Sequence, residues 1–205
     1  MPVPAWFAEI LHKELNPWIA LTSHQVSQLY QHFELLERWN KRMNLTAIEP
    51  GPEMVVRHYC ESLFFGVHLP GDLNTVADMG SGAGFPGIPL AILRENWRIT
   101  LIESNQRKAV FLREATRNLP NVSVLSYRAV EIEKTFDCLV SRAVAPKDIL
   151  ELIPRLGPRI GLMIGEDDIS SVRFDKHIAW AEPVRLPWGV RRFCMYGEYV
   201  SRGTF

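Results

Sequence analysis

From residue 75 onward, short segments rich in β-branched and aliphatic residues alternate with segments of helical periodicity. The strand-like segments span residues 75–79, 98–102, 121–125, 136–140 and 160–164, and helical segments begin near residues 86, 106 and 147. Such alternation is typical of βαβ units, whose parallel strands form one sheet with helices on both faces. The sequence therefore predicts an α/β protein with an open, mostly parallel, Rossmann-like sheet.

The chain before this alternation is helical in pattern. Residues 4–66 carry apolar side chains at helical spacing, and Pro50-Gly51-Pro52 interrupts them. Either Thr22 or Ser23 is suited to cap the longer predicted helix, because a hydroxyl oxygen accepts a hydrogen bond from the first helical turn. We therefore expect an N-terminal helical extension over residues 1–66 that caps the sheet.

The C-terminal segment departs from the βαβ pattern. Residues 178–186 and 192–200 are strand-like, and Pro187-Trp188-Gly189 joins them as a turn. This arrangement predicts an antiparallel hairpin that closes one edge of the sheet. Because the connections are short, we expect residues 67–205 to form one compact unit with the extension packed against it.

Composition excludes several classes of protein. With 47% apolar and 22% charged residues, the 205-residue chain is neither disordered nor fibrous. No apolar run approaches the ~18 residues that a membrane helix needs, and the N-terminus lacks the basic region of a signal peptide. The three cysteines are far apart, which is typical of a reducing compartment and argues against a zinc cluster. We therefore expect a cytoplasmic protein that uses no metal and no membrane, and we take it to be a monomer.

The most specific local signal is the glycine-rich loop Asp78–Gly87, which follows a predicted strand and opens a predicted helix. Glycines let the backbone approach a nucleotide-like ligand. Glu103, at the end of the next strand, is placed to accept hydrogen bonds from two ribose hydroxyl groups. Part of the loop fits the G-x-G-x-x-G pattern of dinucleotide-binding proteins. The whole loop, with an aspartate two residues ahead of three alternating glycines, resembles the S-adenosylmethionine loop of class I methyltransferases. The loop by itself leaves both ligands open.

Substrate and cofactor meet at the end of the fourth strand in such folds, so the residues there limit which atom could accept a methyl group. Its sequence, Asp137–Pro146, lacks the N-P-P-Y-type turn that enzymes acting on exocyclic amino groups usually carry. Methylation of pyrimidine C5 needs a cysteine nucleophile, but Cys138 lies inside the predicted strand and is interpreted as a core residue. A ring nitrogen such as guanine N7 needs only alignment and desolvation. The lack of catalytic machinery is consistent with methylation at N7.

Several motifs occur in the order found in one known family. They are Trp39–Thr46, Arg57–Ser62, Gly80–Ala91, Glu103-Ser104 with Arg107–Leu112, and Val140–Ala143. On these motifs the chain resembles, over residues 20–146, the bacterial 16S ribosomal RNA guanine-N7 methyltransferases, formerly called glucose-inhibited division protein B. The resemblance implies an enzyme of the class I methyltransferase fold that transfers a methyl group from S-adenosylmethionine to a guanine in the decoding-centre loop of 16S ribosomal RNA.

The resemblance also implies roles for individual residues. Those expected to bind the cofactor are Gly80, Gly82, Gly84, Phe85, Glu103, Val130, Glu131 and Arg142. Arg128 and Arg192 resemble basic residues near the substrate face, and no general base is expected. His58 lies on an otherwise apolar face, which indicates a core histidine rather than a catalytic one.

Four basic residues are candidates for contacts with RNA. Arg107 and Lys108 lie in the first turn of a predicted helix, where the macrodipole disfavours cations, so a use outside the helix is indicated. Lys41 and Arg42 follow Trp39, whose indole would either stack on a base or pack at a junction between helices. These residues predict phosphate contacts beside the cofactor loop.

The formal net charge of zero, with 23 basic and 23 acidic residues, by itself argues against a nucleic-acid-binding protein. Counted by segment, it hides two basic patches, because residues 94–117 hold six basic and three acidic residues and residues 185–202 hold four basic and one acidic. Residues 131–182 are acidic, with ten acidic against seven basic side chains. A small basic footprint suits an enzyme that reads a shaped RNA locally.

Two departures from the family pattern concern the face expected to meet RNA. Ile164 stands where family members usually carry a lysine, with Glu166-Asp167-Asp168 just after it, and Gly197-Glu198 stands where a lysine is common.

Two alternative functions stay open: an NAD-dependent oxidoreductase that uses the same loop, and a non-catalytic ribosome-assembly factor with a residual cofactor pocket. For a methyltransferase, the partner would be 16S ribosomal RNA or the 30S subunit.

Overall fold

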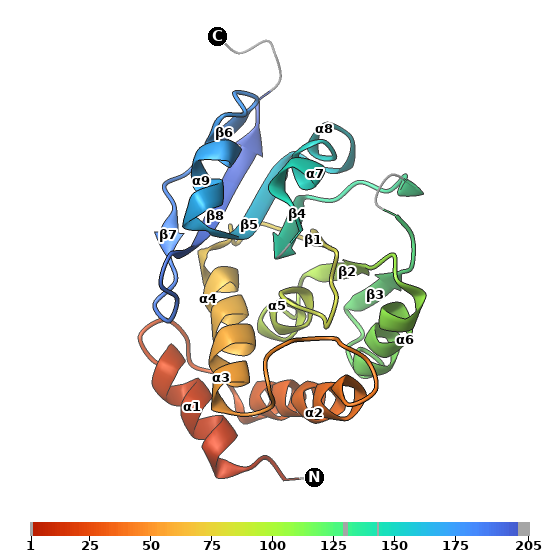
Figure 1. The fold of residues 1–205 in the computed structure, drawn as a ribbon, viewed down its shortest axis with the longest axis vertical. Coiled ribbons are helices and arrows are strands. Elements are labelled where there is room, and N and C mark those ends of the chain that lie inside the picture. Colours follow the sequence, from red (N-terminus) through yellow and green to blue (C-terminus); the bar gives the residue numbers. More distant parts are fainter. Residues whose placement is uncertain (1, 129–130, 143, 201–205) are drawn as a thin grey trace.

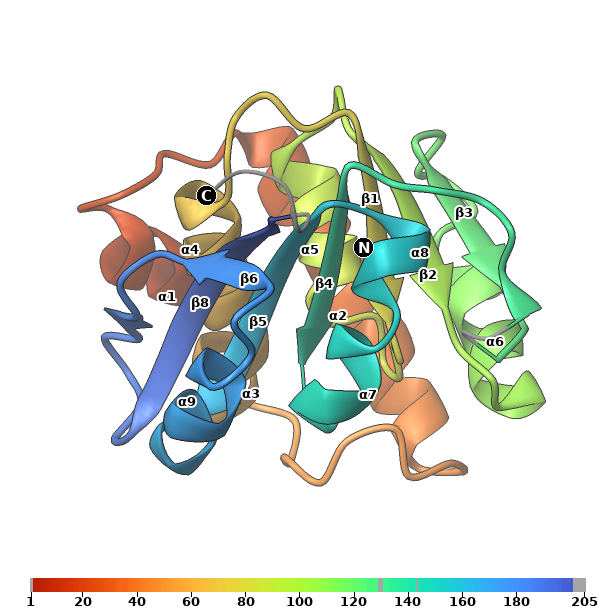
Figure 2. The same cartoon turned by 90° about the horizontal axis from the view of Figure 1, so that it is seen from above.

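The computed structural model describes residues 2–128, 131–142 and 144–200. Its strands are β1 (Thr75–Met79), β2 (Arg98–Ile102), β3 (Val122–Leu125), β4 (Cys138–Arg142), β5 (Arg159–Gly165), β6 (Ile178–Trp180), β7 (Val184–Arg185) and β8 (Arg192–Tyr199). They form one sheet in the order β3-β2-β1-β4-β5-β8-β6, with β7 also paired to β8 (Figure 2). Strands β1 to β5 are parallel, and β8 is antiparallel to its neighbours. The mostly parallel sheet is confirmed.

Helices cover both faces of this sheet (Figures 1 and 2). They are α1 (Ala5–Leu15), α2 (Ser23–Asn40), α3 (Pro52–Met54), the π-helical turn η1 (Val55–Cys60), α4 (Glu61–His68), α5 (Gly87–Leu93), α6 (Gln106–Ala115), α7 (Pro146–Leu150), α8 (Ile153–Leu156) and α9 (Glu166–Arg173). One core lies between the sheet and α4, α5 and α6, and a second lies between the sheet and α7, α8 and α9. No helix in the described ranges is both long and apolar enough to cross a membrane.

The N-terminal helices share the first of these cores with the sheet. Phe7 of α1, Leu36 of α2 and Val76 of β1 belong to one buried cluster, and the boundary expected at residue 66 lies within α4. Helix α2 is capped by Thr22, whose hydroxyl accepts a hydrogen bond from Gln25 N (3.2 Å) while the Gln25 side chain accepts one from Thr22 N (3.0 Å). This reciprocal capping box fixes the start of the helix that reaches the glycine-rich loop.

The C-terminal hairpin is confirmed, but its longer strand does not close the sheet. Strand β8 lies between β5 and β6, so the edge belongs to the short β6. At the tip of the hairpin, Trp188 Nε1 donates to Glu14 Oε2 of α1 (2.7 Å), and its indole packs edge-on against Trp18. The turn between β7 and β8 is thereby attached to the N-terminal helical segment.

Three elements differ from the sequence prediction. The strand expected over residues 178–186 is instead two short strands, β6 and β7, separated by residues 181–183. Strand β4 begins at Cys138, two residues later than expected, because Phe136 turns into the second core and its N–H donates to Leu156 O (2.7 Å). Residues 166–173 form α9, which the sequence did not predict. Its first turn carries Glu166, Asp167 and Asp168, and acidic side chains stabilise the positive end of a helix dipole.

Candidate cofactor and substrate site

The glycine-rich loop crosses from the end of β1 to α5 at the carboxyl edge of the sheet. Gly80, Gly82 and Gly84 all adopt positive φ angles, of 71°, 55° and 88°. A Cβ at Gly80 would lie 2.5 Å from Cγ2 of Val144, so only glycine fits there without a shift of the backbone or of that valine. Ser81 Oγ donates to Asp78 O (2.9 Å) and accepts from Ile102 N (3.1 Å), which fixes the loop to both strands.

Asp78 anchors the far end of the loop from inside the protein. Its Oδ2 accepts from Gly87 N (3.0 Å), while its Oδ1 has no partner among the described residues. Complete burial raises the pKa of Asp78 to about 7, against the hydrogen bonds that favour the ionised form. This carboxyl group holds the first turn of α5 and does not face the site.

Glu103 lies directly after β2 and is 7% exposed. Its Oε2 accepts from Gly82 N (2.9 Å) and its Oε1 accepts from Asn105 N (2.8 Å). Asn105 in turn caps α6 by accepting from the backbone N–H groups of Arg107 (3.0 Å) and Lys108 (3.2 Å). One carboxylate therefore joins the cofactor loop to the N-terminus of α6.

Two cavities flank Gly80, one on each side of the loop. The first, of about 350 Å³, is lined mainly by apolar side chains with a few polar ones: Met79, Ile102, Ser104, Tyr127, Arg128, Val144, Asp148, Ile149 and Leu152. The second, of about 260 Å³, is lined by Leu45, Thr46, His58, the loop residues 80–83, Phe85, Glu103, Lys108 and Arg142. An elongated ligand that crossed Gly80 would meet an apolar wall at one end and basic side chains at the other.

The N-terminal extension contacts the loop through His32 of α2. This buried ring donates from Nε2 to Ala83 O (3.0 Å) and accepts at Nδ1 from the hydroxyl of Tyr59 (2.9 Å). That assignment of donors follows because a carbonyl oxygen only accepts. Burial lowers the pKa of His32 to about 4, so the ring is neutral at physiological pH. A helix 50 residues earlier in the chain thus positions the cofactor loop.

His58 forms part of the wall of the second cavity. Its ring stacks on Phe85 at 4.5 Å between centroids, and its Nε2 lies 2.7 Å from Thr46 Oγ1. Burial first, and then the charge of the nearby Arg142 guanidinium group, lower the pKa of His58 to about 3. The neutral ring packs as a core histidine while one edge lines the cavity.

Three arginines converge on one fully buried carboxylate beside this cavity. Glu61 pairs with Arg57 (3.4 Å) on the same helical stretch, with Arg142 (3.5 Å) at the end of β4 and with Arg192 (2.5 Å) at the start of β8. Burial raises the pKa of Glu61, and the three guanidinium groups oppose that rise. With Glu61 ionised and His58 neutral, the cluster carries two excess positive charges.

Two N–H groups of this cluster lack a hydrogen-bond acceptor among the described residues. Nη1 of Arg142 and Nη1 of Arg192 are both buried and form no hydrogen bond within the described residues. Burial lowers the pKa of Arg142 to about 10, which still leaves it protonated at neutral pH. A buried guanidinium N–H group without an acceptor is costly, so these two Nη1 atoms are suited to bind an anionic group.

The structure brings together most of the residues that the sequence singled out. Gly80, Gly82, Phe85, Glu103, Lys108 and Arg142 line the second cavity, and Arg192 meets Arg142 on Glu61. Arg128 lies on the other side of the loop, in the wall of the first cavity, where its backbone N–H donates to Glu131 Oε2 (2.9 Å). Val130 lies outside the described residues.

The remaining candidates lie farther out. Arg107 is exposed and is absent from the walls of both cavities, although it neighbours Lys108 on α6. Arg42 lines a third hollow, between α2 and α6, and Lys41 pairs with Glu37 (3.5 Å) on the surface of α2. Cys138 is completely buried in the first core, and burial raises the pKa of its thiol, which agrees with its interpretation as a core residue.

Two observations concern the predicted lack of a metal site and the acidic residues that depart from the family pattern after Ile164. Within the described ranges, no three His, Cys, Asp or Glu side chains gather as a metal site. The acidic residues after Ile164 form the first turn of α9, where Glu166 (2.7 Å) and Asp167 both pair with Arg191. They are therefore explained by local helix and ion-pair chemistry.

The fold has many solved relatives. A SAM dependent methyltransferase from Aquifex aeolicus superposes with a TM-score of 0.58 at 19% identity, over 73% of this chain and 94% of that one. The ribosomal protein L11 methylase from Lactobacillus delbrueckii subsp. bulgaricus gives a TM-score of 0.56 at 14% identity, over 71% and 79% of the two chains. The fold is therefore that of the class I, S-adenosylmethionine-dependent methyltransferases.

Sequence comparison narrows the class to a family. The family model GidB, described as rRNA small subunit methyltransferase G, matches residues 25–164. A ribosomal RNA small subunit methyltransferase G from Dichelobacter nodosus is 38% identical over 79% of this chain and 80% of its own length. One from Nitrosomonas europaea is 44% identical, over 60% of this chain and 58% of its own length. The chain belongs to the GidB family of small-subunit ribosomal RNA methyltransferases.

Proposed function

We propose that this protein transfers a methyl group from S-adenosylmethionine to N7 of a guanine in the decoding-centre loop of 16S ribosomal RNA. The observation that carries the proposal is the paired arrangement at Gly80, with an apolar cavity on one side and a basic cavity on the other. Membership of the GidB family favours this reaction over that of a dinucleotide-dependent oxidoreductase. The same membership supplies the substrate class.

The residues present fit S-adenosylmethionine. The apolar cavity beside Ile102 and Tyr127 suits the adenine, and the buried Glu103 carboxylate at the junction suits the ribose hydroxyl groups. The unpartnered Nη1 of Arg142 and the ammonium group of Lys108 supply positive charge for the amino-acid carboxylate or for RNA. When bound, the cofactor supplies a methyl group on a sulfonium, and the chain's part is to align and desolvate the acceptor.

Methylation at a ring nitrogen agrees with what the cavity holds. His58, the titratable ring in its wall, is kept neutral by a pKa of about 3 and hydrogen-bonded to Thr46. Glu103 in the same wall accepts from two backbone N–H groups, and the lone pair of guanine N7 requires no base. The arginine cluster on Glu61 would receive the phosphate of the target nucleotide through Arg192.

The test is transfer of radiolabelled methyl groups from S-adenosylmethionine to free 16S RNA and to 30S subunits, followed by mapping of the modified base. We expect label at guanine N7 in one of these substrates. A protein that binds the cofactor but labels neither substrate would instead support a non-catalytic ribosome-assembly factor. Light scattering with size exclusion would check that the protein is a monomer, and cell fractionation would check that it is cytoplasmic.

A further inference from the structure

One large hollow on the described surface lies away from the cofactor loop, between the end of α2 and α6. It measures about 530 Å³ and is lined by Leu35, Arg38, Trp39, Lys41, Arg42, Met43 and Glu114. A smaller hollow of about 200 Å³ shares Leu35, Arg38 and Glu114 with it and continues along the same two helices toward Arg117. Together they form a groove, here called the α2–α6 groove, that the proposed reaction does not use.

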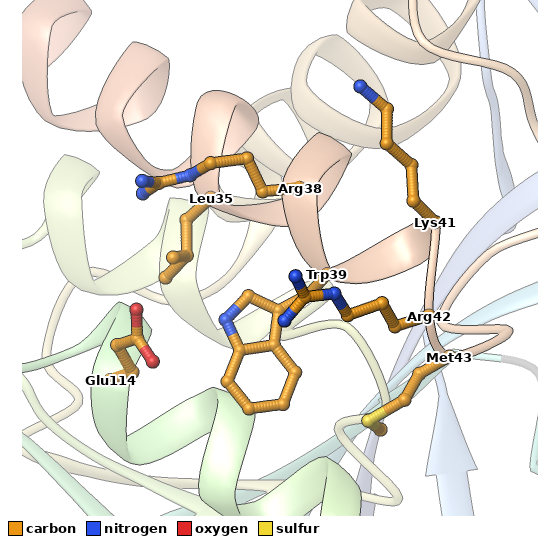
Figure 3. Close-up of a pocket in the computed structure, with 7 residues that line it drawn as sticks. All are labelled: Leu35, Arg38, Trp39, Lys41, Arg42, Met43 and Glu114. Carbon is orange, nitrogen blue, oxygen red and sulfur yellow. The ribbon is translucent and has the colours of Figure 1, made fainter.

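Three kinds of side chain face each other across this groove (Figure 3). Trp39 presents a half-buried indole that is held edge-on against Phe111 at 5.8 Å between centroids. Arg38 and Arg42 are exposed and, within the described residues, neither guanidinium group forms an ion pair or hydrogen bond. Glu114 faces them from α6 and is likewise unpaired in the described structure, while the ammonium group of Lys41 pairs with Glu37.

This combination has a specific chemical complement. The hollow separates the two arginines from the glutamate. A ligand that bridges them therefore needs an anionic group to pair with the arginines and N–H donors to pair with the glutamate. The indole adds a requirement for a flat apolar face. A nucleotide supplies all three, since its phosphate pairs with guanidinium groups, its base stacks on an aromatic ring and its Watson–Crick edge carries donors.

Among the bases, guanine matches the carboxylate best. Its N1–H and 2-amino groups point in one direction and can donate together to the two oxygens of Glu114. Uracil presents a single N–H between two carbonyl oxygens. The partial negative charge of these oxygens would be repelled by the carboxylate. The groove should therefore discriminate guanine from uracil through Glu114.

The groove is connected to the cofactor cavity by a rigid turn. Asn40 clamps this turn by donating from Nδ2 to Thr46 O (3.0 Å) and by accepting at Oδ1 from the N–H groups of Leu45 (2.9 Å) and Thr46 (3.0 Å). Met43 lies in the groove, and Leu45 and Thr46 line the cofactor cavity. Along α6, Lys108 of the cavity and Glu114 of the groove are six residues apart, which is about 9 Å of helix. The two sites are within reach of a few linked nucleotides.

We infer that the α2–α6 groove binds a second, single-stranded nucleotide of the RNA substrate, a guanine that flanks the methylated one. Trp39 stacks on its base, Glu114 accepts from its Watson–Crick edge, and Arg38 and Arg42 pair with its phosphates. This inference rests on the proposed function, since it takes the bound RNA to be the substrate. It adds a specificity-determining contact outside the cofactor site.

The test measures binding of a fluorescein-labelled single-stranded RNA octamer that carries one guanine, by anisotropy without cofactor. Replacement of that guanine by uridine should weaken binding by wild-type protein roughly 10-fold, because it removes a bidentate contact with the carboxylate. Glu114→Gln should abolish this preference, and Arg38→Gln should weaken binding of both octamers equally. The matched controls are Glu95→Gln and Arg98→Gln, whose exposed side chains lie outside the groove and should change neither quantity.

The outcomes separate this inference from the proposed function. If wild-type protein methylates 16S RNA but binds the two octamers equally, or if Glu114→Gln keeps the preference, the groove is not a guanine site and the inference is overturned. If wild-type protein fails to methylate RNA yet shows the Glu114-dependent preference, the groove binds a nucleotide and the methylation proposal fails instead. Calorimetry with S-adenosylmethionine should give equal affinities for all four variants, which checks that they are folded.

Discussion

Single positions in the cofactor loop admit one residue type, and Gly80 is the clearest case. With φ at 71° and Val144 2.5 Å from where a Cβ would stand, Gly80→Ala must displace the loop or the valine. We expect the affinity for S-adenosylmethionine to fall at least roughly 10-fold by calorimetry, since a displaced loop misplaces the ligand's backbone contacts. Gly71→Ala is the control, because nothing lies within 4 Å of its Cβ position. Equal affinities for the two variants would contradict this account of the loop.

The buried histidines predict how stability depends on pH. Burial lowers the pKa of His32 from 6.5 to about 4. Between these pH values the His32 ring binds a proton in the unfolded chain but not in the folded protein. The stabilising contribution is complete above pH 6.5 and is lost as the pH falls toward 4. At pH 5 the loss from His32 alone is about 2 kcal/mol.

Urea unfolding of wild type and His32→Gln at pH 7.5 and pH 5 measures this loss. Glutamine keeps a donor for Ala83 O but does not titrate, so the variant should lose about 2 kcal/mol less than wild type on acidification. The groups that titrate in both proteins, such as Asp78, cancel in the comparison. Parallel losses in the two proteins would show that His32 is not held neutral.

Residues differ in how far their roles can be predicted from sequence. The glycines of the loop and Glu103 were identifiable because their spacing follows a strand and a helix start that leave few alternatives. His32 and Glu61 were missed because each lies in a helical pattern, and their roles depend on contacts with Ala83 and Arg192 far along the chain. The available signal was a polar residue on the buried face of an amphipathic helix, a position that requires a partner.

At the scale of elements, α2 offers a direct test of its start. Thr22 forms the capping box with Gln25, whereas the neighbouring Ser23 is the first helical residue. Thr22→Ala should therefore lower the free energy of unfolding by about 1 kcal/mol, and Ser23→Ala should change it by only a few tenths. Urea denaturation of both variants measures the difference. A larger effect of Ser23→Ala would mean that the helix begins one residue later.

Elements with strong periodicity were predictable, and those formed by tertiary contacts were not. Strands β1 and β2 match their predicted ranges because aliphatic runs bounded by turns leave little freedom. The start of β4 was predicted too early because Phe136 has high strand propensity, although it packs into the second core instead. Helix α9 was missed because its first turn is acidic and lacks apolar spacing, and Arg191 pairs with that turn from elsewhere in the chain.

The whole molecule has no net charge, and basic residues outnumber acidic ones in residues 94–117 and 185–202. Contacts with RNA are therefore expected from the arginine cluster, from Lys108 and from the α2–α6 groove, and not from a continuous basic surface. With three or four phosphate contacts, the logarithm of the RNA affinity should fall with the logarithm of salt concentration at a slope of about −2 to −3. A slope steeper than about −6 would require many more contacts and would contradict this charge distribution.

The position of β8 has a consequence for the order in which the molecule is completed. This strand pairs with β5 from Arg192 to Glu198 and brings Arg192 to Glu61, although Glu61 lies more than a hundred residues earlier in the chain. During synthesis, β1 to β5 and the cofactor loop leave the ribosome first, with one edge of β5 still unpaired. The third arginine reaches the buried carboxylate only when translation has passed β8. A nascent chain therefore carries the residues proposed to bind the cofactor before it acquires Arg192, which is proposed to meet RNA.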